Sequence, residues 1–247
     1  MATVNTPSVA TQVTTPVCIT FSAITSFDRN EGEPIVIPPS AHTLNGFRKW
    51  ALSKEFPERG SLSFVNGDFL IDMSPERIDT HNFLKTEITT VIAMLVKQGK
   101  KGYFFSDRTL LSNLGATIST EPDAMFISRD SLSRGRAQFT PHGDRPQEAM
   151  ELVGTPDWVL EIVSISSKKK DKVLLREAYY QAGIGEYWLV DALGEEIDFQ
   201  ILVPGEKEYV AVTAEEGWLP SPTFGKSFRL ERATDEDGFL EYTLHMH

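Results

Sequence analysis

Residues 155–191 read TPDWVLEIVSISSKKKDKVLLREAYYQAGIGEYWLVD, and this stretch is the strongest indication of the fold class. Its first apolar run, 158–163, predicts a buried strand, and a second run, 186–191, predicts another. Between them, residues 171–182 have the pattern of a helix that Gly183 ends. Two strands joined by a helix indicate a crossover unit in a sheet. We therefore expect a mixed α/β single domain in which this unit joins a largely antiparallel sheet.

The remaining sequence predicts further elements on both sides of this unit. Alternating apolar and polar residues over 61–72 surround Asn66-Gly67, which predicts a hairpin with a two-residue turn. An apolar stripe at helical spacing predicts a long helix over 75–97. The other expected elements are a short helix that begins at Ser40 or Thr43 and ends near Glu55, and strands near 103–106, 110, 124–127, 197–203, 208–213 and 224–230.

Two stretches lack the pattern of regular structure. Residues 1–21 are rich in Thr, Val, Pro and Ser, so we expect a disordered or loosely attached arm before a single domain at 22–247. Residues 129–150 are polar and rich in Arg, Gly and Pro, which predicts a long surface loop.

The composition bounds the class of protein. Hydrophobic residues make up 40% of the 247 and charged residues 24%, which is ordinary for a globular protein. Cys18 is the one cysteine, which excludes an intramolecular disulfide and a cysteine-rich zinc site. The apolar runs are shorter than the ~20 residues of a membrane span, and there is no secretory signal pattern. We therefore expect a soluble, cytoplasmic protein.

The net charge of −11 is unevenly distributed. Residues 177–247 carry 15 acidic and 4 basic side chains, so this part accounts for the whole net charge and residues 1–176 are balanced. Overall acidity argues against tight non-specific binding of nucleic acid, which needs clustered Lys and Arg. The balanced part can still carry a local basic face, so the charge does not decide the question.

A carboxylate interrupts the apolar strand expected at 158–163. Strand alternation places Glu161 on the same face as Val159 and Val163. A carboxylate in the middle of an apolar strand is costly unless it is solvated, paired or bound to a cation. Glu161 therefore either lies in water on an edge strand or faces a catalytic cleft as a metal ligand.

Asp123 is a second candidate, at the point where a turn enters an expected strand. Asp is common in such turns, so this residue alone indicates no function. Two carboxylates presented by neighbouring strands, Asp123 and Glu161, would form a hard oxygen site suited to Mg²⁺ or Mn²⁺.

A basic run follows Glu161 at the start of the expected helix. Such runs usually form a solvated face. Beside an acidic metal site, a lysine can instead stabilise developing phosphate charge or orient an attacking water. The run contains Lys168, Lys169 and Lys170, with Lys172 and Arg176 after it.

The long helix carries His81 and Glu87. At 100° per residue, the two residues flank the apolar stripe on opposite sides, so they cannot both reach one point without long side chains. His81 is either a surface histidine of the first turn or a site residue, and Glu87 lies at the margin of the core. Motifs of other enzyme classes, namely GxGxxG, Walker A, GxSxG and HExxH, are absent from the sequence.

Taken together, the stretch 155–191 resembles the Uma-two family of endonucleases, which belongs to the PD-(D/E)XK, restriction-endonuclease-like superfamily. The sequence EPDAMFI at 121–127 resembles the Pro-Asp strand of that family. The sequence THNFLKTEI at 80–88 resembles its helix with a His and, six residues later, a Glu. The resemblance covers about 62–203, and it implies a central mixed sheet flanked by helices and a divalent-metal phosphodiesterase site.

The resemblance also implies roles for individual residues. Asp123 and Glu161 would be metal ligands, and Glu87 would be the helix carboxylate near them. His81 would support the site. The implied reaction is attack of metal-activated water on a phosphodiester, with Mg²⁺ or Mn²⁺ also neutralising charge on the phosphate.

The family lysine is displaced in this sequence. A literal Glu-x-Lys motif would place the lysine at residue 163, where this chain has Val163. Many relatives carry it four residues after the aspartate that corresponds to Asp171, where this chain has Leu175. Lys170 is therefore the candidate for the displaced lysine, and Lys172 is the next candidate.

We expect a Mg²⁺- or Mn²⁺-dependent nuclease acting on DNA. The rival hypothesis is a catalytically silent relative that keeps the fold as a binding or dimerisation module. A metal-dependent hydrolase of a nucleotide or another small phosphate ester is a third hypothesis. A homodimer would suit cleavage of both strands, although no residue pattern requires one. The arginines of the expected loop that could contact backbone phosphates, if the loop is more than a solvated segment, are Arg129, Arg134, Arg136 and Arg145.

Overall fold

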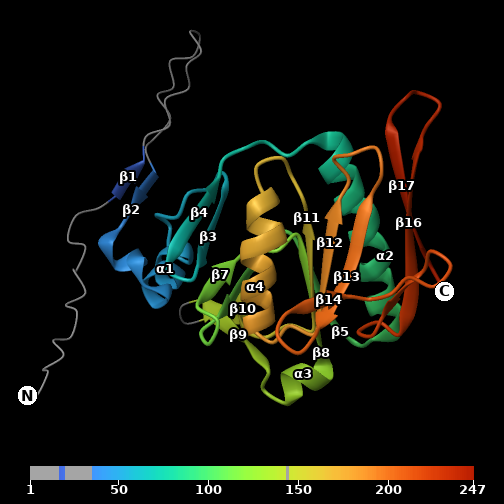
Figure 1. Cartoon of the computed structure of the whole chain (residues 1–247). Coiled ribbons are helices and arrows are strands. Elements are labelled where there is room, and N and C mark those ends of the chain that lie inside the picture. Colours follow the sequence, from blue (N-terminus) through green and yellow to red (C-terminus); the bar gives the residue numbers. More distant parts are fainter. Residues whose placement is uncertain (1–16, 20–34, 143–144) are drawn as a thin grey trace, which may run out of the picture. The chain divides into compact units, whose positions relative to one another are not determined.

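The computed structural model describes residues 17–19, 35–142 and 145–247, and the chain forms two compact units, Met1–Pro57 and Glu58–His247 (Figure 1). The first unit contains antiparallel strands β1 (Val17–Ile19) and β2 (Ile35–Ile37), a 3-10 turn (Pro39–His42) and helix α1 (Leu44–Ala51). Thr43 caps α1, because its hydroxyl accepts a hydrogen bond of 3.1 Å from the N–H of Gly46. The rest of the expected arm at 1–21 lies outside the described residues, and a single domain from residue 22 stays a prediction.

The second unit is built on two six-stranded sheets and one three-stranded sheet. The central sheet has the order β14 (Tyr209–Ala211), β13 (Asp198–Pro204), β12 (Glu186–Asp191), β11 (Trp158–Ile162), β8 (Ala124–Ser128) and β5 (Gly102–Ser106). The other six-stranded sheet has the order β4 (Asp68–Asp72), β3 (Ser61–Val65), β7 (Ile118–Thr120), β6 (Leu110–Asn113), β10 (Arg145–Gly154) and β9 (Ala137–His142). The C-terminal sheet has the order β15 (Leu219–Ser221), β16 (Lys226–Thr234) and β17 (Leu240–Met246).

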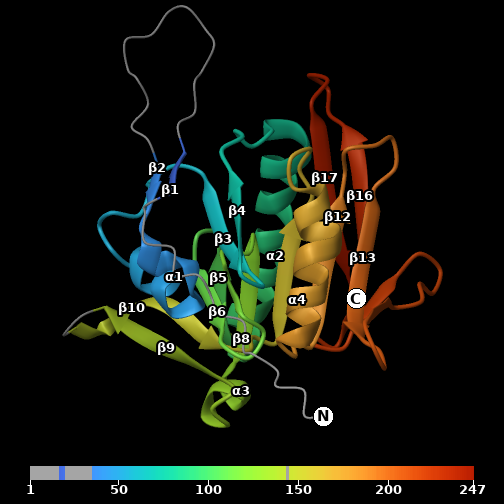
Figure 2. The same ribbon diagram turned by 60° about the vertical axis from the view of Figure 1, so that its left-hand side comes forward.

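Helices cover both faces of the central sheet (Figures 1 and 2). On one face, α2 (Phe83–Gly99) packs its stripe, including Ile88, into an apolar cluster with Leu160 of β11. On the other face, α4 (Arg176–Gln181) packs Tyr179 into a second cluster with Val159. Glu161 shares the α4 face, because side chains alternate along β11. Among the described residues, no helix is long and apolar enough to cross a membrane.

The mixed α/β fold expected from 155–191 is confirmed. β11 pairs in parallel with β12, from Trp158 opposite Glu186 to Ile162 opposite Val190, and it pairs antiparallel with β8. The connection between the two parallel strands begins as a π-helical turn (Lys170–Leu175) and continues as α4. This is the crossover unit that the sequence predicts.

The expected hairpin is also present, and the long helix begins later than expected. β3 and β4 are joined at Asn66 and Gly67, whose φ angles of 53° and 95° are the left-handed values that a type I′ turn requires. Arg77 is extended, and a π-helical turn (Ile78–Asn82) precedes α2. His81 therefore lies in an irregular turn and not in the regular part of the helix.

The prediction of a long surface loop at 129–150 is wrong. This segment forms α3 (Arg129–Ser133), which Ser128 caps by accepting a hydrogen bond from the N–H of Ser131, and then β9 and most of β10. β10 pairs in parallel with β6 and antiparallel with β9. Since β9 is the edge of its sheet, it tolerates the polar residues and the proline that resemble a loop in the sequence.

Candidate active site

A cavity of about 320 Å³ opens in the larger unit where β8 begins and β11 ends. Most of the charged side chains that line it are acidic, which is unusual for a partly buried space because like charges repel one another. The acidic lining residues are Asp72, Glu76, Asp107, Glu121, Asp123, Glu161 and Asp171. The basic residues around it are Arg108, Lys170 and His81.

Asp123 and Glu161 meet because their strands are neighbours. Leu160 lies opposite Ala124, so Asp123, the residue before β8, reaches the end of β11. One carboxylate oxygen of Asp123, Oδ2, accepts a hydrogen bond of 2.7 Å from the N–H of Ile162. β11 lies between β8 and β12, and Glu161 is only 2% exposed. The alternative of a solvated Glu161 on an edge strand is therefore wrong.

Burial controls the charge of Glu161. Tyr179 donates a hydrogen bond of 2.5 Å to Glu161 Oε1 from the α4 side. Burial raises the pKa of Glu161 well above its ordinary value; Lys170 opposes this rise, and the carboxylates of Asp171 and Asp123 add to it. A cation next to Glu161 would reverse these effects and favour the carboxylate.

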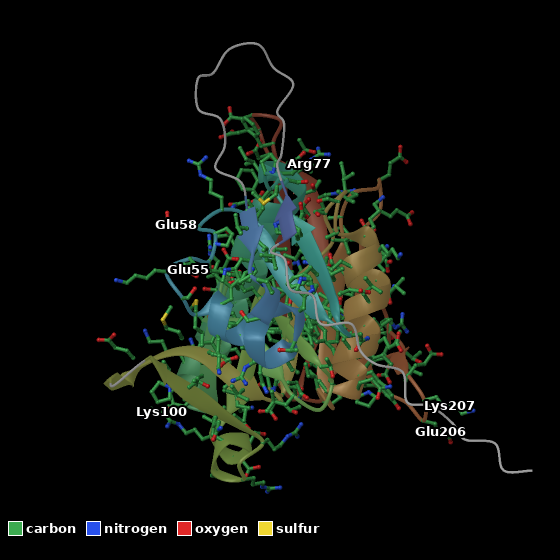
Figure 3. The ribbon with its side chains drawn as sticks, turned by 90° about the vertical axis from the view of Figure 1, so that its left-hand side faces the viewer. Glu55, Glu58, Arg77, Lys100, Glu206 and Lys207 are labelled. Carbon is green, nitrogen blue, oxygen red and sulfur yellow. The ribbon has the colours of Figure 1, made fainter. Side chains whose placement is uncertain are left out.

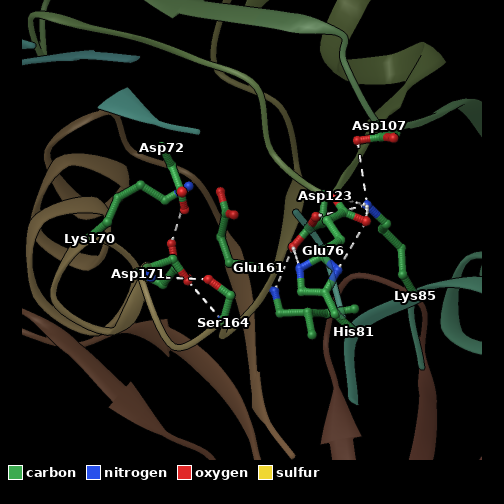
Figure 4. Close-up of polar contacts among 12 residues, drawn as sticks. Asp72, Glu76, His81, Lys85, Asp107, Asp123, Glu161, Ser164, Lys170 and Asp171 are labelled. Atoms are coloured by element: carbon green, nitrogen blue, oxygen red, sulfur yellow. Dashed lines mark hydrogen bonds and ion pairs between the residues drawn. The ribbon is translucent and has the colours of Figure 1, made fainter. Parts of the chain in front are cut away.

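Lys170 lies in the cavity with this carboxyl, as the sequence analysis proposes (Figure 4). Its Nζ is 3.5 Å from Oδ1 of Asp171. Burial lowers the pKa of Lys170, but Glu161 and Asp171 raise it further, so its pKa is above the ordinary value. Burial raises the pKa of Asp171 to about 6. Lys172, the second candidate, pairs instead with Asp191 at 2.6 Å and is not among the residues that line the cavity.

His81 approaches Asp123 from the other side of the cavity. Its Nε2 is 3.6 Å from Asp123 Oδ2, and its Nδ1 is 3.4 Å from Glu76 Oε2. Burial lowers the pKa of His81, but Glu76 and Asp123 raise it above the ordinary value. The nearby His81 and Lys85 hold the pKa of Glu76 down to about 2. His81 is therefore buried in the lining of the cavity and is not a surface histidine.

Lys85, which the sequence did not single out, contacts three of the carboxylates that line the cavity. Its side chain is buried, and its Nζ is 2.8 Å from Glu76 Oε1, 3.5 Å from Asp123 Oδ1 and 3.6 Å from Asp107 Oδ1 (Figure 4). One signal could have found it: Lys85 follows His81 by four residues, a spacing that puts two side chains on the same side of a helix.

The structure does not bring Glu87 to the cavity. Glu87 Oε1 accepts a hydrogen bond of 2.9 Å from the N–H of Leu244 in β17. The expectation that Glu87 lies near Asp123 and Glu161 is therefore wrong. The physical reason is the six-residue spacing, which turns Glu87 away from His81 and toward the C-terminal sheet.

Arg129, Arg134 and Arg136 follow the end of β8 that is distant from Asp123, because α3 begins after the last residue of that strand. Arg129 donates a hydrogen bond to the carbonyl of Lys100. Lys100 lies at the end of α2 opposite to Arg77, as Figure 3 shows. Arg134 pairs with Asp130, Arg136 lies 3.9 Å from Asp157, and the side chain of Arg145 lies outside the described residues. Arg129, Arg134 and Arg136 do not line the cavity.

On the Glu161 side, the cavity has carboxylates that could hold a divalent cation. Glu121, Glu161 and Asp171 all line it, and burial raises the pKa of each. Hard carboxylate oxygens are the ligands that Mg²⁺ and Mn²⁺ prefer. Asp123 and Glu161 would hold such a cation, and Asp171 is close enough to their charges to contribute.

The backbone next to these ligands is also unusual. Asp107 and Arg108 both have left-handed φ angles, 49° and 52°, and the N–H of Asp107 donates to the carbonyl of Asp123 at 3.0 Å. Consecutive non-glycine residues in this conformation carry strain, which is commonly found at functional sites.

The sequence matches the Uma2 family model, whose description is "Putative restriction endonuclease", over residues 44–233. The chain belongs to the Uma2 family. A crystal structure titled as a "putative nuclease belonging to DUF820" from Anabaena variabilis is 20% identical, with a TM-score of 0.54, and the match covers 74% of this chain and 90% of that one. At this identity the likeness shows the fold. Among curated proteins there is no match.

Leu175 stands where the resemblance described in the sequence analysis leads us to expect a lysine. Leu175 is fully buried in the apolar cluster that contains Tyr179, so this position supplies core packing in place of a charge. Lys170 enters the cavity from the first residue of the same π-helical turn. The chain thus keeps an amine in the cavity although it lacks one at residue 175.

Proposed function

We propose that this Uma2 protein is a divalent-metal-dependent nuclease that hydrolyses phosphodiester bonds in DNA, with Mg²⁺ or Mn²⁺ as its cofactor. One observation carries the proposal: Asp123 and Glu161 converge from neighbouring strands in an acidic cavity that also holds Lys170. The family description supports the reaction class.

In this proposal, different residues of the cavity bind the metal and stabilise the phosphate. Asp123 and Glu161 would hold the cation, which when bound activates water and neutralises phosphate charge. The Ile162 N–H fixes Oδ2 of Asp123, whose Oδ1 faces Lys85 Nζ at 3.5 Å. The Tyr179 hydroxyl fixes Oε1 of Glu161, so Glu161 keeps Oε2 for a ligand. Lys170, held charged by its acidic neighbours, would stabilise the charge that develops on the phosphate.

The silent binding or dimerisation module remains the competing hypothesis. Leu175 at the family lysine position favours it, because a site without a usable lysine would lose most of its activity. The presence of Lys170 in the cavity is the observation against it. A hydrolase of small phosphate esters would use the same metal site and would differ by sparing polymeric DNA.

Cleavage of supercoiled and single-stranded DNA in Mn²⁺, Mg²⁺ or EDTA tests the proposal. We expect metal-dependent cleavage by the wild type and loss of cleavage in Asp123→Asn and Glu161→Gln. Glu87→Gln is the matched control, because this carboxylate lies outside the cavity and should not be needed. Equal cleavage by wild type and Asp123→Asn would identify a contaminant. An absence of both cleavage and Mn²⁺-induced thermal stabilisation would favour the silent module.

A further inference from the structure

Lys85 occupies the centre of a cluster that has the donor atoms of a metal site. Glu76, His81 and Asp123 each offer a ligand atom, and these atoms lie within 4.8 Å of one another. The Lys85 ammonium group is 2.8 Å and 3.0 Å from the two oxygens of Glu76 and 3.5 Å from Asp123 Oδ1. A positive charge therefore already lies where these carboxylates would bind a cation.

His81 is the second observation that points to a ligand. The residue is 6% exposed, and its Nδ1 is buried without a hydrogen bond to any described residue. Its closest charged neighbour is Glu76 Oε2, an ion-pair contact of 3.4 Å. An imidazole nitrogen beside two carboxylates is a donor set that suits Zn²⁺, Co²⁺ or Mn²⁺ better than Mg²⁺.

We propose that the Lys85 ammonium group is a built-in cation that closes this second metal position. Lys85 would thereby confine the divalent ion to the Glu161 side of Asp123 and determine how many ions, and which metals, the cavity accepts. This inference rests on the proposed function, in which Asp123 and Glu161 hold the catalytic cation.

The charge balance supports this role. Asp107 also contacts Lys85, at 3.6 Å, so three carboxylates surround one buried ammonium group. An uncompensated buried charge is strongly unfavourable. Removal of the Lys85 charge would leave these carboxylates to bind another cation or to take up protons. With His81 among them, capture of a transition metal is the expected result.

Metal stoichiometry tests the proposal without relying on catalysis. Titration of Lys85→Met with Co²⁺ should reveal about one more bound equivalent than in the wild type, with an additional visible d–d absorption band from the second bound ion. The double variant Lys85→Met/His81→Gln should lose that extra equivalent and the band. Lys172→Met is the matched control, because Lys172 also forms ion pairs with two carboxylates, Asp191 and Asp198. No histidine takes part in these ion pairs, so this variant should bind no extra Co²⁺.

The outcomes separate this inference from the proposed function. The gain is scored against the wild type, so it is measurable whether or not the wild type cleaves DNA. No extra equivalent in Lys85→Met, or an extra equivalent that survives His81→Gln, would overturn the role of Lys85. If Lys85→Met does not fold, as judged by circular dichroism, Lys85→Gln removes the same charge and keeps a polar contact to Glu76, and the same result is expected of it.

Discussion

Glu161 on β11 and Glu186 on β12 are buried carboxyls on adjacent parallel strands, and their hydrogen bonding differs. Glu186 accepts hydrogen bonds from Trp188 Nε1 at 2.5 Å, from the Ser221 hydroxyl at 2.7 Å and from the N–H of Thr223 at 2.9 Å. Among the described residues, Glu161 accepts one, from Tyr179. A buried carboxylate with satisfied oxygens holds a structure together, whereas one with a free oxygen in a cavity can bind a ligand.

Replacement of Glu186 should therefore reduce stability. Glu186→Ala leaves three donors without their acceptor, two of them buried, and removes the hydrogen bonds that link β12 to the segment around Ser221. We expect the free energy of unfolding to fall by about 2–5 kcal/mol. Urea denaturation followed by tryptophan fluorescence measures this change. A loss below about 0.5 kcal/mol, the range of ordinary surface substitutions, would contradict the structural role of Glu186.

Replacement of Glu161 should have the opposite effect on the metal-free protein. Glu161→Gln removes a group whose ionisation is opposed by burial and keeps an oxygen that can accept from Tyr179. In EDTA, we expect the free energy of unfolding of Glu161→Gln to exceed that of the wild type by about 0.5–2 kcal/mol, because residues kept for function often reduce stability. The gain should increase with pH, because wild-type Glu161 must then ionise. Denaturation at several pH values checks this, and a clear loss of stability in EDTA would show that Glu161 is a structural residue.

The sequence singled out Asp123 and Glu161, which both line the cavity, because their signals are local. Glu161 interrupts an otherwise apolar strand, and Asp123 follows a proline at the start of another. The crossover unit was equally evident, since β11 and β12 are short apolar runs on either side of a helical segment. Fold class and two principal carboxylates could therefore be identified before any tertiary information.

The parts that could not be predicted depend on contacts distant in the sequence. Glu87 accepts from Leu244, 157 residues away, and no local pattern indicates that β17 covers this side of α2. Lys85 has the sequence signature of a solvated helix residue, and its three carboxylate partners come from other segments. β9 and β10 resemble a loop in their polar composition, because β9 is the edge strand of its sheet and one of its two sides pairs with no other strand.

The metal affinity of the cavity should increase with pH. In the metal-free protein, burial raises the pKa of Asp171 from 3.8 to about 6, so the folded state holds a proton that the unfolded state releases. The stability due to this group is fully present below about pH 4 and is lost as the pH rises through about 6. A divalent cation must displace that proton and the proton of Glu161, so Mn²⁺ binding should strengthen over the same range.

Calorimetric titration with Mn²⁺ between pH 5 and pH 7.5 in buffers of different ionisation enthalpy measures both the affinity and the protons released. Asp171→Asn should flatten the dependence of affinity on pH. Affinity that does not change over this range, with no proton release, would show that neither carboxyl is displaced by the metal.

Lys170 should be needed for cleavage and not for metal binding. Its ammonium group lies in the cavity, whereas the neighbouring Lys169 is exposed, so the two lysines form a matched pair. We expect Lys170→Met to reduce DNA cleavage by about 10²–10³-fold, because one charged donor to the developing phosphate charge is lost. Lys169→Met should cleave at the wild-type rate. Both variants should keep the Mn²⁺-induced thermal shift, since Asp123 and Glu161 remain. Undiminished DNA cleavage by Lys170→Met would show that Lys170 takes no part in the reaction and does not substitute for the lysine expected at residue 175.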